Sequence, residues 1–373
     1  MGIVIDYSSG FFEATPSGET VGSVSGNATL DLTSGNVFNH TPTANTTFAF
    51  SNPPTSGTAQ AFTLKLTGAN VTEGYDIPNI STDATTDQFD TLVTTSQDVF
   101  IRDNGTDLFI LEYAGVLKHF TLATAFDITS TPTLVTSLDL KGTTGTGLSA
   151  SAFDFRAFTF SPDGTQVLIR ADDSTLRICQ FSLATAFDLS STKTHVGNWT
   201  GITSTFFNDS RGVRFANNGS IVTLGGNNTA RSFGIAQLST PYDITSVSSS
   251  TKYDLNTDFG YTTRTSYWVW GSYYSSDGKK LIISSTFGYE VVLLLLATPF
   301  DPSSYTSMTE HNIADLASLH FISDGTKAIS ERNTSTGDFA MYSTSGATAL
   351  ATIAYPSSVE FAGGTAPDAP ANG

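Results

Sequence analysis

The sequence predicts an all-β protein in which a small N-terminal β-module precedes a β-propeller of five four-stranded blades. Three observations carry this prediction. Two sequence markers recur with one shared period along most of the chain, and every repeat unit reads as short strands and turns. Charged residues make up only 14% of the 373 residues, well below the usual quarter. Ser, Thr, Asn and Gly replace them, and these residues favour polar turns over helices.

The first marker is an apolar strand, a tight turn and a second strand. It occurs as IRDNGTDLFIL, FSPDGTQVLIR, FANNGSIVTLG, YSSDGKKLIIS and FISDGTKAISE. Its turn glycines, spaced 59, 55, 59 and 47 residues apart, are Gly105, Gly164, Gly219, Gly278 and Gly325. Asp-Gly and Asn-Gly supply the positive φ angles that a tight hairpin needs. Each marker therefore predicts two adjacent antiparallel strands.

The second marker reads TLATAFDITS, SLATAFDLSS, QLSTPYDITS and LLATPFDPSS, and it follows each of the first four turns. Its aspartates, 61, 55 and 58 residues apart, are Asp127, Asp188, Asp243 and Asp301. We interpret this marker as structural: the aromatic residue fills the gap between blades, and the aspartate accepts hydrogen bonds from backbone amides of the turn. The alternative is a calcium or sugar site repeated in every blade.

Four strands per repeat are the signature of a propeller blade. In the second repeat, a strand ends at Phe160, another covers residues 167–169, a third covers 176–183 and a fourth lies at about 194–199. A solenoid would need much shorter rungs or helical pairs. Five turn glycines predict five blades, and a sixth, degenerate blade stays open as an alternative.

The tripeptide Tyr75-Asp76-Ile77 resembles the second marker without the preceding part of a blade. We therefore expect residues 75 to about 95 to supply the outer strand of a blade whose other three strands lie near residues 319–349. Such a join removes exposed sheet edges. The resulting domain prediction is an N-terminal module at 1–72, a propeller at 73–350 and a C-terminal tail at 351–373.

The N-terminal segment contains neither marker, but short apolar alternations are visible at Leu30/Leu32, Phe48/Phe50 and Phe62/Leu64/Leu66. These predict a small β-module of about fifty residues. A module of this size buries little core. We therefore expect it to pack against copies of itself or against another protein, as an anchoring and oligomerisation module.

Two parts of the chain carry a resemblance to known proteins: TANTTFAFSNPPTSGTAQAFTLKLTGA, and LATAFDITS or LSTPYDITS after an SPDGT-like turn. The first is similar to a module of tail-fibre and other virion structural proteins of tailed bacteriophages, marine and cyanobacterial ones especially, and the second resembles repeats of the same kind of proteins. The first likeness covers about forty residues and the second covers most of the rest. The resemblance implies a non-enzymatic virion protein, a tail fibre or a capsid decoration, and it carries over no catalytic residues.

The expected partners follow from this resemblance. Other virion proteins would bind through the N-terminal module, and a host-surface glycan or receptor would bind to the propeller of a homo-oligomer. The chain would be made in the host cytoplasm and located in the virion. The net charge of −17 argues against nucleic-acid binding and against an anionic membrane surface, and no segment predicts membrane insertion. The alternative function is an independent carbohydrate-binding or glycoside-hydrolase propeller.

The sequence predicts no catalytic site, no cofactor and no metal site. Glu112, Glu290, Glu310 and Glu331 do not recur with an aspartate as an axial carboxylate pair would. The five histidines lack ligand spacing, and the single cysteine, Cys179, reads as a buried strand thiol.

The densest aromatic stretch is YTTRTSYWVWGSYY, at residues 261–274. The candidate ligand-binding residues in it are Tyr267, Trp268, Trp270 and Tyr273. Exposed Trp and Tyr side chains stack on sugar rings or anchor a protein partner. The competing interpretation is core or inter-blade packing, because alternation along this stretch buries one face of a strand.

Overall fold

The computed structural model describes residues 18–21, 26–32, 37–40, 46–52, 63–66, 72–86, 88–172, 176–202, 210–226, 231–262, 269–285, 290–313, 316–332, 337–344 and 346–347. The chain divides into two compact units, Gly74–Ser345 and Met1–Glu73 with Gly346–Gly373. The predicted C-terminal tail, 351–373, lies outside the described residues.

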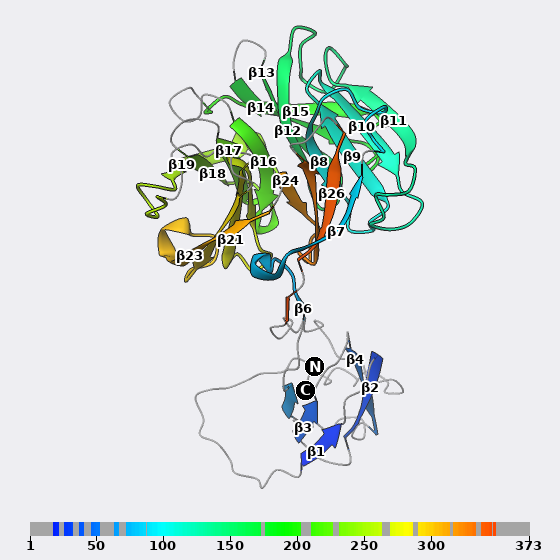
Figure 1. Ribbon diagram of the computed structural model, residues 1–373, viewed down its shortest axis with the longest axis vertical. Coiled ribbons are helices and arrows are strands. Elements are labelled where there is room, and N and C mark those ends of the chain that lie inside the picture. Colours follow the sequence, from blue (N-terminus) through cyan, green and yellow to red (C-terminus); the bar gives the residue numbers. More distant parts are fainter. Residues whose placement is uncertain are drawn as a thin grey trace, which may run out of the picture. The chain divides into compact units, whose positions relative to one another are not determined.

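The larger unit is a five-bladed β-propeller, as the five turn glycines predict (Figure 1). Blade 1 contains β8 (Ser96–Ile101), β9 (Asp107–Glu112), β10 (Val116–Thr121) and β11 (Thr133–Asp139). Blade 2 contains β12 (Phe153–Phe160), β13 (Gln166–Asp172), β14 (Leu176–Leu183) and β15 (Lys193–Trp199). Blade 3 contains β16 (Ser210–Ala216), β17 (Ile221–Gly226), β18 (Ser232–Leu238) and β19 (Val247–Asp254). Blade 4 contains β20 (Val269–Tyr274), β21 (Lys280–Ser285), β22 (Glu290–Leu296) and β23 (Tyr305–Asn312). All four sheets are antiparallel meanders.

Blade 5 is assembled from both ends of the unit. Its first three strands are β24 (Leu316–Phe321), β25 (Lys327–Arg332) and β26 (Phe339–Ser343), and its outer strand is β7 (Ser81–Thr86). Strand β7 pairs antiparallel with β26, with Thr86 opposite Phe339. The predicted closing strand is therefore confirmed. The helical elements in the described part of the chain are four 3₁₀ turns, η1 (Ile77–Asn79), η2 (Asn217–Gly219), η3 (Ile244–Ser246) and η4 (Pro302–Ser304).

The inner strands β8, β12, β16, β20 and β24 contact one another in turn, and β24 contacts β8, so the ring closes. Side chains of adjacent blades form shared apolar clusters; Phe109 of blade 1 and Phe158 of blade 2 belong to one of them. The outer strands are mostly exposed, as in β11 and β23. Burial therefore decreases from the axis outward.

The second marker has the predicted structural role. Phe126, Phe187, Tyr242 and Phe300 adopt positive φ angles of 61°, 60°, 58° and 62°, and each ring lies against the turn glycine of its own blade. The Phe187 ring also lies 6.4 Å from Phe100 of the neighbouring blade, so it fills the gap between blades.

The marker aspartates cap the following turns. Asp127, Asp188, Asp243 and Asp301 each accept a backbone N–H from the residue two positions later. The hydrogen bonds that Asp127 accepts from the Thr129 side chain and backbone lower the pKa of its carboxyl group. Tyr75 supplies the fifth copy of the marker aromatic: its φ is 62° and its ring lies against Gly325.

The other unit is built from parallel strand pairs. Strands β1 (Gly18–Val21), β3 (Val37–His40) and β5 (Thr63–Leu66) form one sheet, and β2 (Gly26–Asp31) and β4 (Thr46–Ser51) form another. Strands alternate between the two sheets along the chain, so the segment winds like a short solenoid. In the same unit, β6 (Thr72–Glu73) pairs antiparallel with β27 (Gly346–Ala347).

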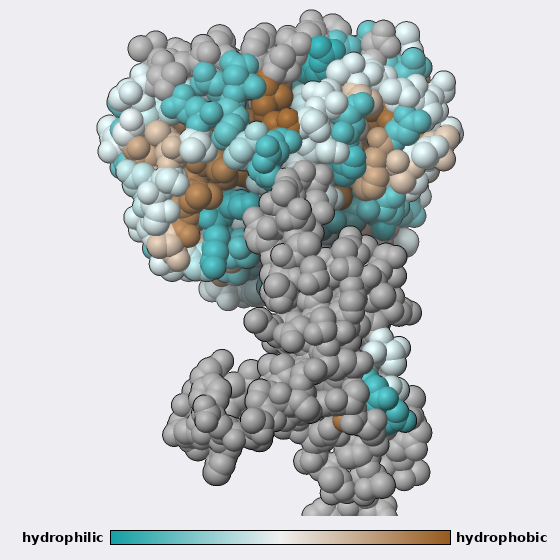
Figure 2. All heavy atoms as spheres, turned by 60° about the horizontal axis from the view of Figure 1, so that its bottom comes forward, coloured by the Kyte–Doolittle hydropathy of each residue, from teal (hydrophilic) through white to brown (hydrophobic). Residues whose placement is uncertain are grey.

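The surface of the propeller is largely polar. On the face shown in Figure 2, hydrophobic side chains occupy small areas between hydrophilic ones. Six large hydrophobic residues are exposed among those described: Tyr113, Leu134, Val135, Val196, Leu295 and Tyr305. No helix in the described part of the chain is long and apolar enough to cross a membrane.

Candidate functional site

The candidate site follows from one position of the repeat. Each inner strand places a residue on the propeller axis five positions before the turn glycine. The five blades carry different residues there, namely Phe100, Thr159, Arg214, Tyr273 and His320. All five line one cavity. The marker residues are alike because they have the same structural role in every blade. The five axial residues differ from one another, and together they line a single cavity.

A buried ion pair crosses the axis. Both terminal nitrogens of Arg214 bind Asp98, with Nη2 2.6 Å from Oδ1 and Nη1 2.7 Å from Oδ2. Their side chains are only 4% and 2% exposed. Nη1 also donates to the carbonyl oxygens of Phe158 and Val213, and Asp98 accepts the backbone N–H groups of Val99 and Phe158. The charges are therefore paired and hydrogen-bonded, as burial requires.

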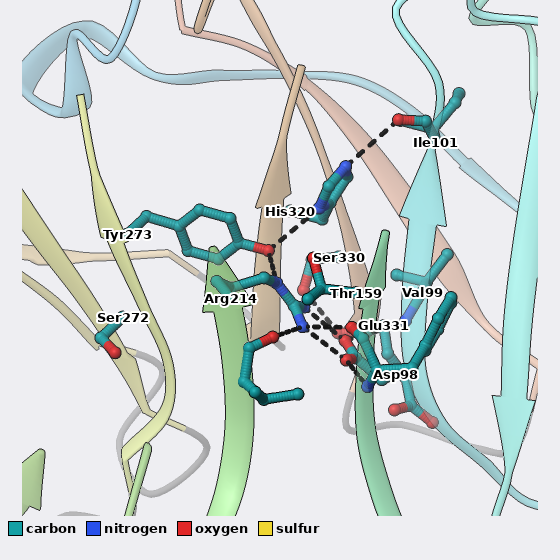
Figure 3. A network of polar contacts seen from close by, with 12 residues as sticks. Asp98, Val99, Ile101, Thr159, Arg214, Ser272, Tyr273, His320, Ser330 and Glu331 are labelled. Carbon is teal, nitrogen blue, oxygen red and sulfur yellow. Dashed lines mark hydrogen bonds and ion pairs between the residues drawn. The ribbon is translucent and has the colours of Figure 1, made fainter. Parts of the chain in front are cut away.

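Two further side chains extend this network (Figure 3). Nε of Arg214 donates to the hydroxyl oxygen of Tyr273, which lies 3.0 Å from Nδ1 of His320. Nε2 of His320 lies 3.1 Å from the carbonyl oxygen of Ile101. A carbonyl oxygen only accepts, so Nε2 carries the proton and Nδ1 accepts the hydroxyl proton of Tyr273. The axial network of Asp98, Arg214, Tyr273 and His320 thus draws partners from all five blades.

The axial network has no net charge. Burial lowers the pKa of His320 well below its usual value, and the nearby Arg214 charge lowers it further, so the imidazole is neutral. Burial raises the pKa of Tyr273, which keeps its proton. Burial by itself lowers the pKa of Arg214, but the Asp98 carboxylate outweighs that effect and raises it. One cation and one anion remain, and they neutralise each other.

A second buried carboxyl group interacts electrostatically with Asp98. Glu331 on β25 accepts a hydrogen bond from the Ser96 hydroxyl on β8, across the junction of blades 5 and 1. Burial raises the pKa of Glu331 to about 7. Sequence spacing indicated no such axial carboxylate pair, because the two residues are far apart in the chain and come from different strands of their blades. Neither carboxyl group lines the axial cavity.

The axial cavity, which we call the axial pocket, has a volume of about 260 Å³. Arg214, Tyr273 and His320 are buried polar residues of its lining, and we call them its floor. Its mouth is formed by the turn of blade 1, with Arg102, Asp103 and Asn104, and by Pro162 and Ser323 from two other turns. It therefore opens at the end of the propeller where the first hairpins turn.

The walls of the axial pocket are mainly aromatic. Their rings come from Tyr75, Phe100, Phe160, Phe187, Phe215, Tyr274 and Phe321. Phe187 and Tyr75 are marker residues, so the repeat that fills the gaps between blades also builds part of the pocket. The guanidinium of Arg102 lies 4.1 Å above the Phe187 ring, a cation–π contact at the mouth. An apolar pocket with a few polar groups is typical of small-ligand sites.

The structure brings one of the four predicted ligand-binding residues to this pocket. Tyr273 contributes to the floor, and its buried hydroxyl belongs to the axial network. Trp270 is half-buried, lies outside the pocket lining and has the Arg211 guanidinium 4.9 Å above its ring. Tyr267 and Trp268 lie outside the described residues.

Sequence reasoning missed Asp98, Arg214 and His320. The signal for Arg214 and His320 was present in the repeat alignment, because they occupy the same blade position as Tyr273, whereas Asp98 occupies a different position. Cys179 is buried, as predicted, and its thiol lies 2.9 Å from the carbonyl oxygen of Thr146. Among the residues that the structure describes, no group of three or more His, Cys, Asp or Glu is placed to hold a metal ion.

Comparison with known proteins adds no functional assignment. No family model and no curated protein matches the sequence. Solved structures similar to the chain include a functionally unknown protein from Desulfotomaculum acetoxidans DSM 771 (11% identity, TM-score 0.37, 64% of this chain and 62% of that chain). Another is a putative 6-phosphogluconolactonase from Bacteroides fragilis NCTC 9343 (14%, 0.38, 62% and 61%). A third is a protein from Lactobacillus plantarum (12%, 0.40, 64% and 64%). The chain spans less than two thirds of each, and such distant likeness carries no argument about activity.

Proposed function

We propose that this chain is a non-enzymatic structural protein of a tailed-bacteriophage virion, a tail fibre or a capsid decoration, whose propeller binds the host surface. The axial pocket carries the adhesion part of the proposal. It offers aromatic walls and a mouth with exposed polar side chains, above a floor whose polar groups already bind one another. Because the floor groups are already paired, the aromatic walls and the polar mouth would make the contacts with a ligand.

The virion part of the proposal is supported by the resemblance of both chain regions to virion proteins. The N-terminal unit adds a physical reason for assembly. Among the residues that the structure describes, its strands β1 and β5 are the outer strands of a three-stranded parallel sheet, and the edge strands of a sheet can pair with other chains. Several propellers held on one particle would add weak contacts into strong attachment.

Glycoside hydrolysis is the rival function. It needs two carboxyl groups that reach the glycosidic bond from opposite sides. Asp98 and Glu331 are the buried carboxyl groups closest to this requirement, since the pKa of Glu331 is raised to about 7. However, Asp98 is held by both terminal nitrogens of Arg214, and neither group lines the pocket. This arrangement supports binding over hydrolysis.

The test has two arms. Antibodies against the propeller should label intact phage particles from the source of this chain, and the purified full-length chain should bind host cells and block adsorption of the phage. Binding should strengthen when the protein is displayed in many copies on a bead. Particles that carry no label would refute the virion assignment, and labelled particles whose adsorption the chain does not block would refute the adhesion role.

A further inference from the structure

The size of the axial pocket limits its ligand. Pockets that enclose drug-sized ligands have volumes of about 300–1,000 Å³, and the axial pocket holds about 260 Å³. It therefore accommodates a single ring-sized group. A longer ligand would have to continue outward past the mouth.

The walls favour a ligand with apolar faces. Phe100 and Phe160 lie with their ring centroids 5.1 Å apart, and Phe160 and Phe187 lie 5.2 Å apart. Aromatic faces carry a negative quadrupole and attract weakly positive hydrogen atoms. The axial C–H groups of a pyranose ring present such hydrogens on one face, while its hydroxyl groups point to the rim.

The mouth supplies both donors and acceptors. Arg102 uses Nη1 to bind Asp107 at 2.5 Å, and its side chain remains one-third exposed. Asp103 accepts the backbone N–H of Ser323 through Oδ1 at 2.8 Å, while its Oδ2 faces no hydrogen-bond partner among the described residues. Neighbouring sugar hydroxyl groups can donate to a carboxylate and accept from a guanidinium at the same time.

The charges around the pocket favour a neutral ligand. Arg214 in the floor is neutralised by Asp98, and Arg102 at the mouth is paired with Asp107, so neither cation is available as a strong anion site. Asp103 is exposed at the mouth and repels an anion. The whole chain also carries a net charge of −17, which disfavours anionic ligands at long range.

We propose that the axial pocket binds one uncharged pyranose ring, the terminal or branching sugar of a host-surface glycan. The C–H groups of the sugar ring pack against the aromatic walls, and its hydroxyl groups bind Arg102 and Asp103. This inference rests on the proposed adhesion function and names the ligand class for it. Each site binds weakly, because a single sugar offers few atoms, so attachment depends on several copies.

The first experiment is an NMR titration of the full-length chain with methyl glucoside, methyl galactoside, methyl mannoside and N-acetylglucosamine, alongside glucuronic acid and N-acetylneuraminic acid. At least one neutral sugar should show saturable binding with a Kd on the order of 1 mM. The two anionic sugars should bind at least about tenfold more weakly. Absence of binding by every neutral sugar at about 50 mM, or preference for an anionic one, would overturn the inference.

A matched pair of variants locates the site. Ser323 lies at the mouth, and only its backbone takes part in the hydrogen bonds described. Ser323→Trp should obstruct the pocket and weaken sugar binding at least about tenfold. Ser276 occupies the equivalent exposed turn position of blade 4 and does not line the pocket, so Ser276→Trp should leave binding unchanged. Equal effects of the two variants would place the sugar elsewhere.

A third variant tests the charge argument. Asp103→Asn retains an acceptor for the Ser323 amide and removes the negative charge at the mouth. The ratio of neutral to anionic sugar affinity should fall at least about threefold, with the melting temperature unchanged. An unaltered ratio in this variant would show that Asp103 does not face the ligand.

Host-cell binding separates this inference from the function on which it rests. If the full-length chain binds cells but no neutral sugar binds the chain, the inference fails and the adhesion function stands. If a neutral sugar binds the wild type and not Ser323→Trp, while neither protein binds cells, the pocket assignment stands and the adhesion function fails.

Discussion

At the scale of single residues, Arg214 is a charged side chain that the propeller interior can hold only if it is paired. It is almost fully buried, it binds Asp98 through two nitrogens, and its third nitrogen binds Tyr273. Taking such a pair out of water costs several kcal/mol per ion, which the attraction between them only partly offsets. The Arg214–Asp98 pair therefore contributes little net stability. Removing one partner, however, leaves the charge of the other buried and unpaired.

Replacing Arg214 should consequently be far more harmful than replacing an exposed arginine. Arg214→Met should lower the free energy of unfolding by about 3–5 kcal/mol, because Asp98 keeps a buried, uncompensated charge. Urea denaturation followed by circular dichroism measures this change. Arg102→Met is the control: it breaks a partly exposed pair with Asp107 and should cost about 1 kcal/mol or less.

The double variant Asp98→Asn, Arg214→Met should recover part of this loss, because no charge is then left unpaired. If the double variant were as unstable as the sum of both single variants, the charges would not be the cause. Packing of the long arginine side chain would then be the better explanation.

Glu331 should make stability depend on pH. Its folded-state pKa of about 7 exceeds its usual 4.5, so the folded protein retains a proton that the unfolded chain releases. The stabilisation is complete below about pH 4.5 and is lost as the pH rises through about 7. His320 acts in the opposite direction, because its lowered pKa removes stability as the pH falls below about 6.5. Between about pH 4.5 and pH 6.5, a rise in pH therefore lowers stability through Glu331 and raises it through His320.

Glu331→Gln should therefore be more stable than the wild type at pH 8, by at most about 3 kcal/mol at 1.36 kcal/mol per pKa unit. At pH 5 the two proteins should be similar, since Glu331 is then protonated and neutral. Thermal melts from pH 5 to pH 8 follow the difference. A constant offset between the two proteins at every pH would mean that Glu331 does not titrate in this range.

At the scale of the blade, the two sequence markers contact each other, because the aromatic residue of the second marker packs on the turn glycine of the first. The first hairpin turns at a glycine with a positive φ angle, and the marker aromatic covers that glycine. A Cβ atom on Gly164 would lie 2.1 Å from the Phe187 ring, whereas a Cβ atom on Gly260 would meet nothing within 4 Å. Both glycines have nearly the same φ, 72° and 74°. They therefore separate backbone strain from side-chain contact.

Gly260→Ala should cost only the strain of a left-handed backbone, about 1–2 kcal/mol. Gly164→Ala should cost about 1–3 kcal/mol more, because the Phe187 ring must also move out of the gap between blades 1 and 2. Denaturant unfolding of both variants measures the difference. Equal losses would show that the aromatic ring adapts without cost.

At the scale of the whole molecule, the propeller closes without the other unit. Strand β7 completes blade 5, and Tyr75 supplies the last marker aromatic, so Gly74–Ser345 contains all five blades. Because β6 and β27 pair with each other within the other unit, removing both together leaves no unpaired partner strand. Closure of this kind protects a ring of sheets from opening at its edges.

A chain of residues 74–345 should accordingly fold and remain monomeric, while the full-length chain should oligomerise through its N-terminal unit. Light scattering gives the mass of each, and circular dichroism gives the strand signal. A truncated chain that still assembles would place the interface in the blades. A truncated chain that does not fold would mean that the propeller depends on the other unit.

The sequence determined the repeat, the number of blades and the closing strand, because these depend on local chemistry. A turn glycine needs a positive φ angle, and the following aromatic and aspartate interact with the same hairpin, so each blade repeats them. Tyr75-Asp76-Ile77 indicated the closure for the same reason. It could be recognised without any knowledge of the residues with which it pairs.

Only the tertiary structure decided the axial network and the pocket. Asp98 and Arg214 are 116 residues apart in sequence, and each looks like an ordinary strand residue in its own repeat. Their chemistry appears when closure of the ring brings five non-identical positions to one axis. A repeated sequence pattern identifies the residues that every blade has in common. The site instead consists of axial residues that differ from blade to blade. These residues come together only when the ring closes.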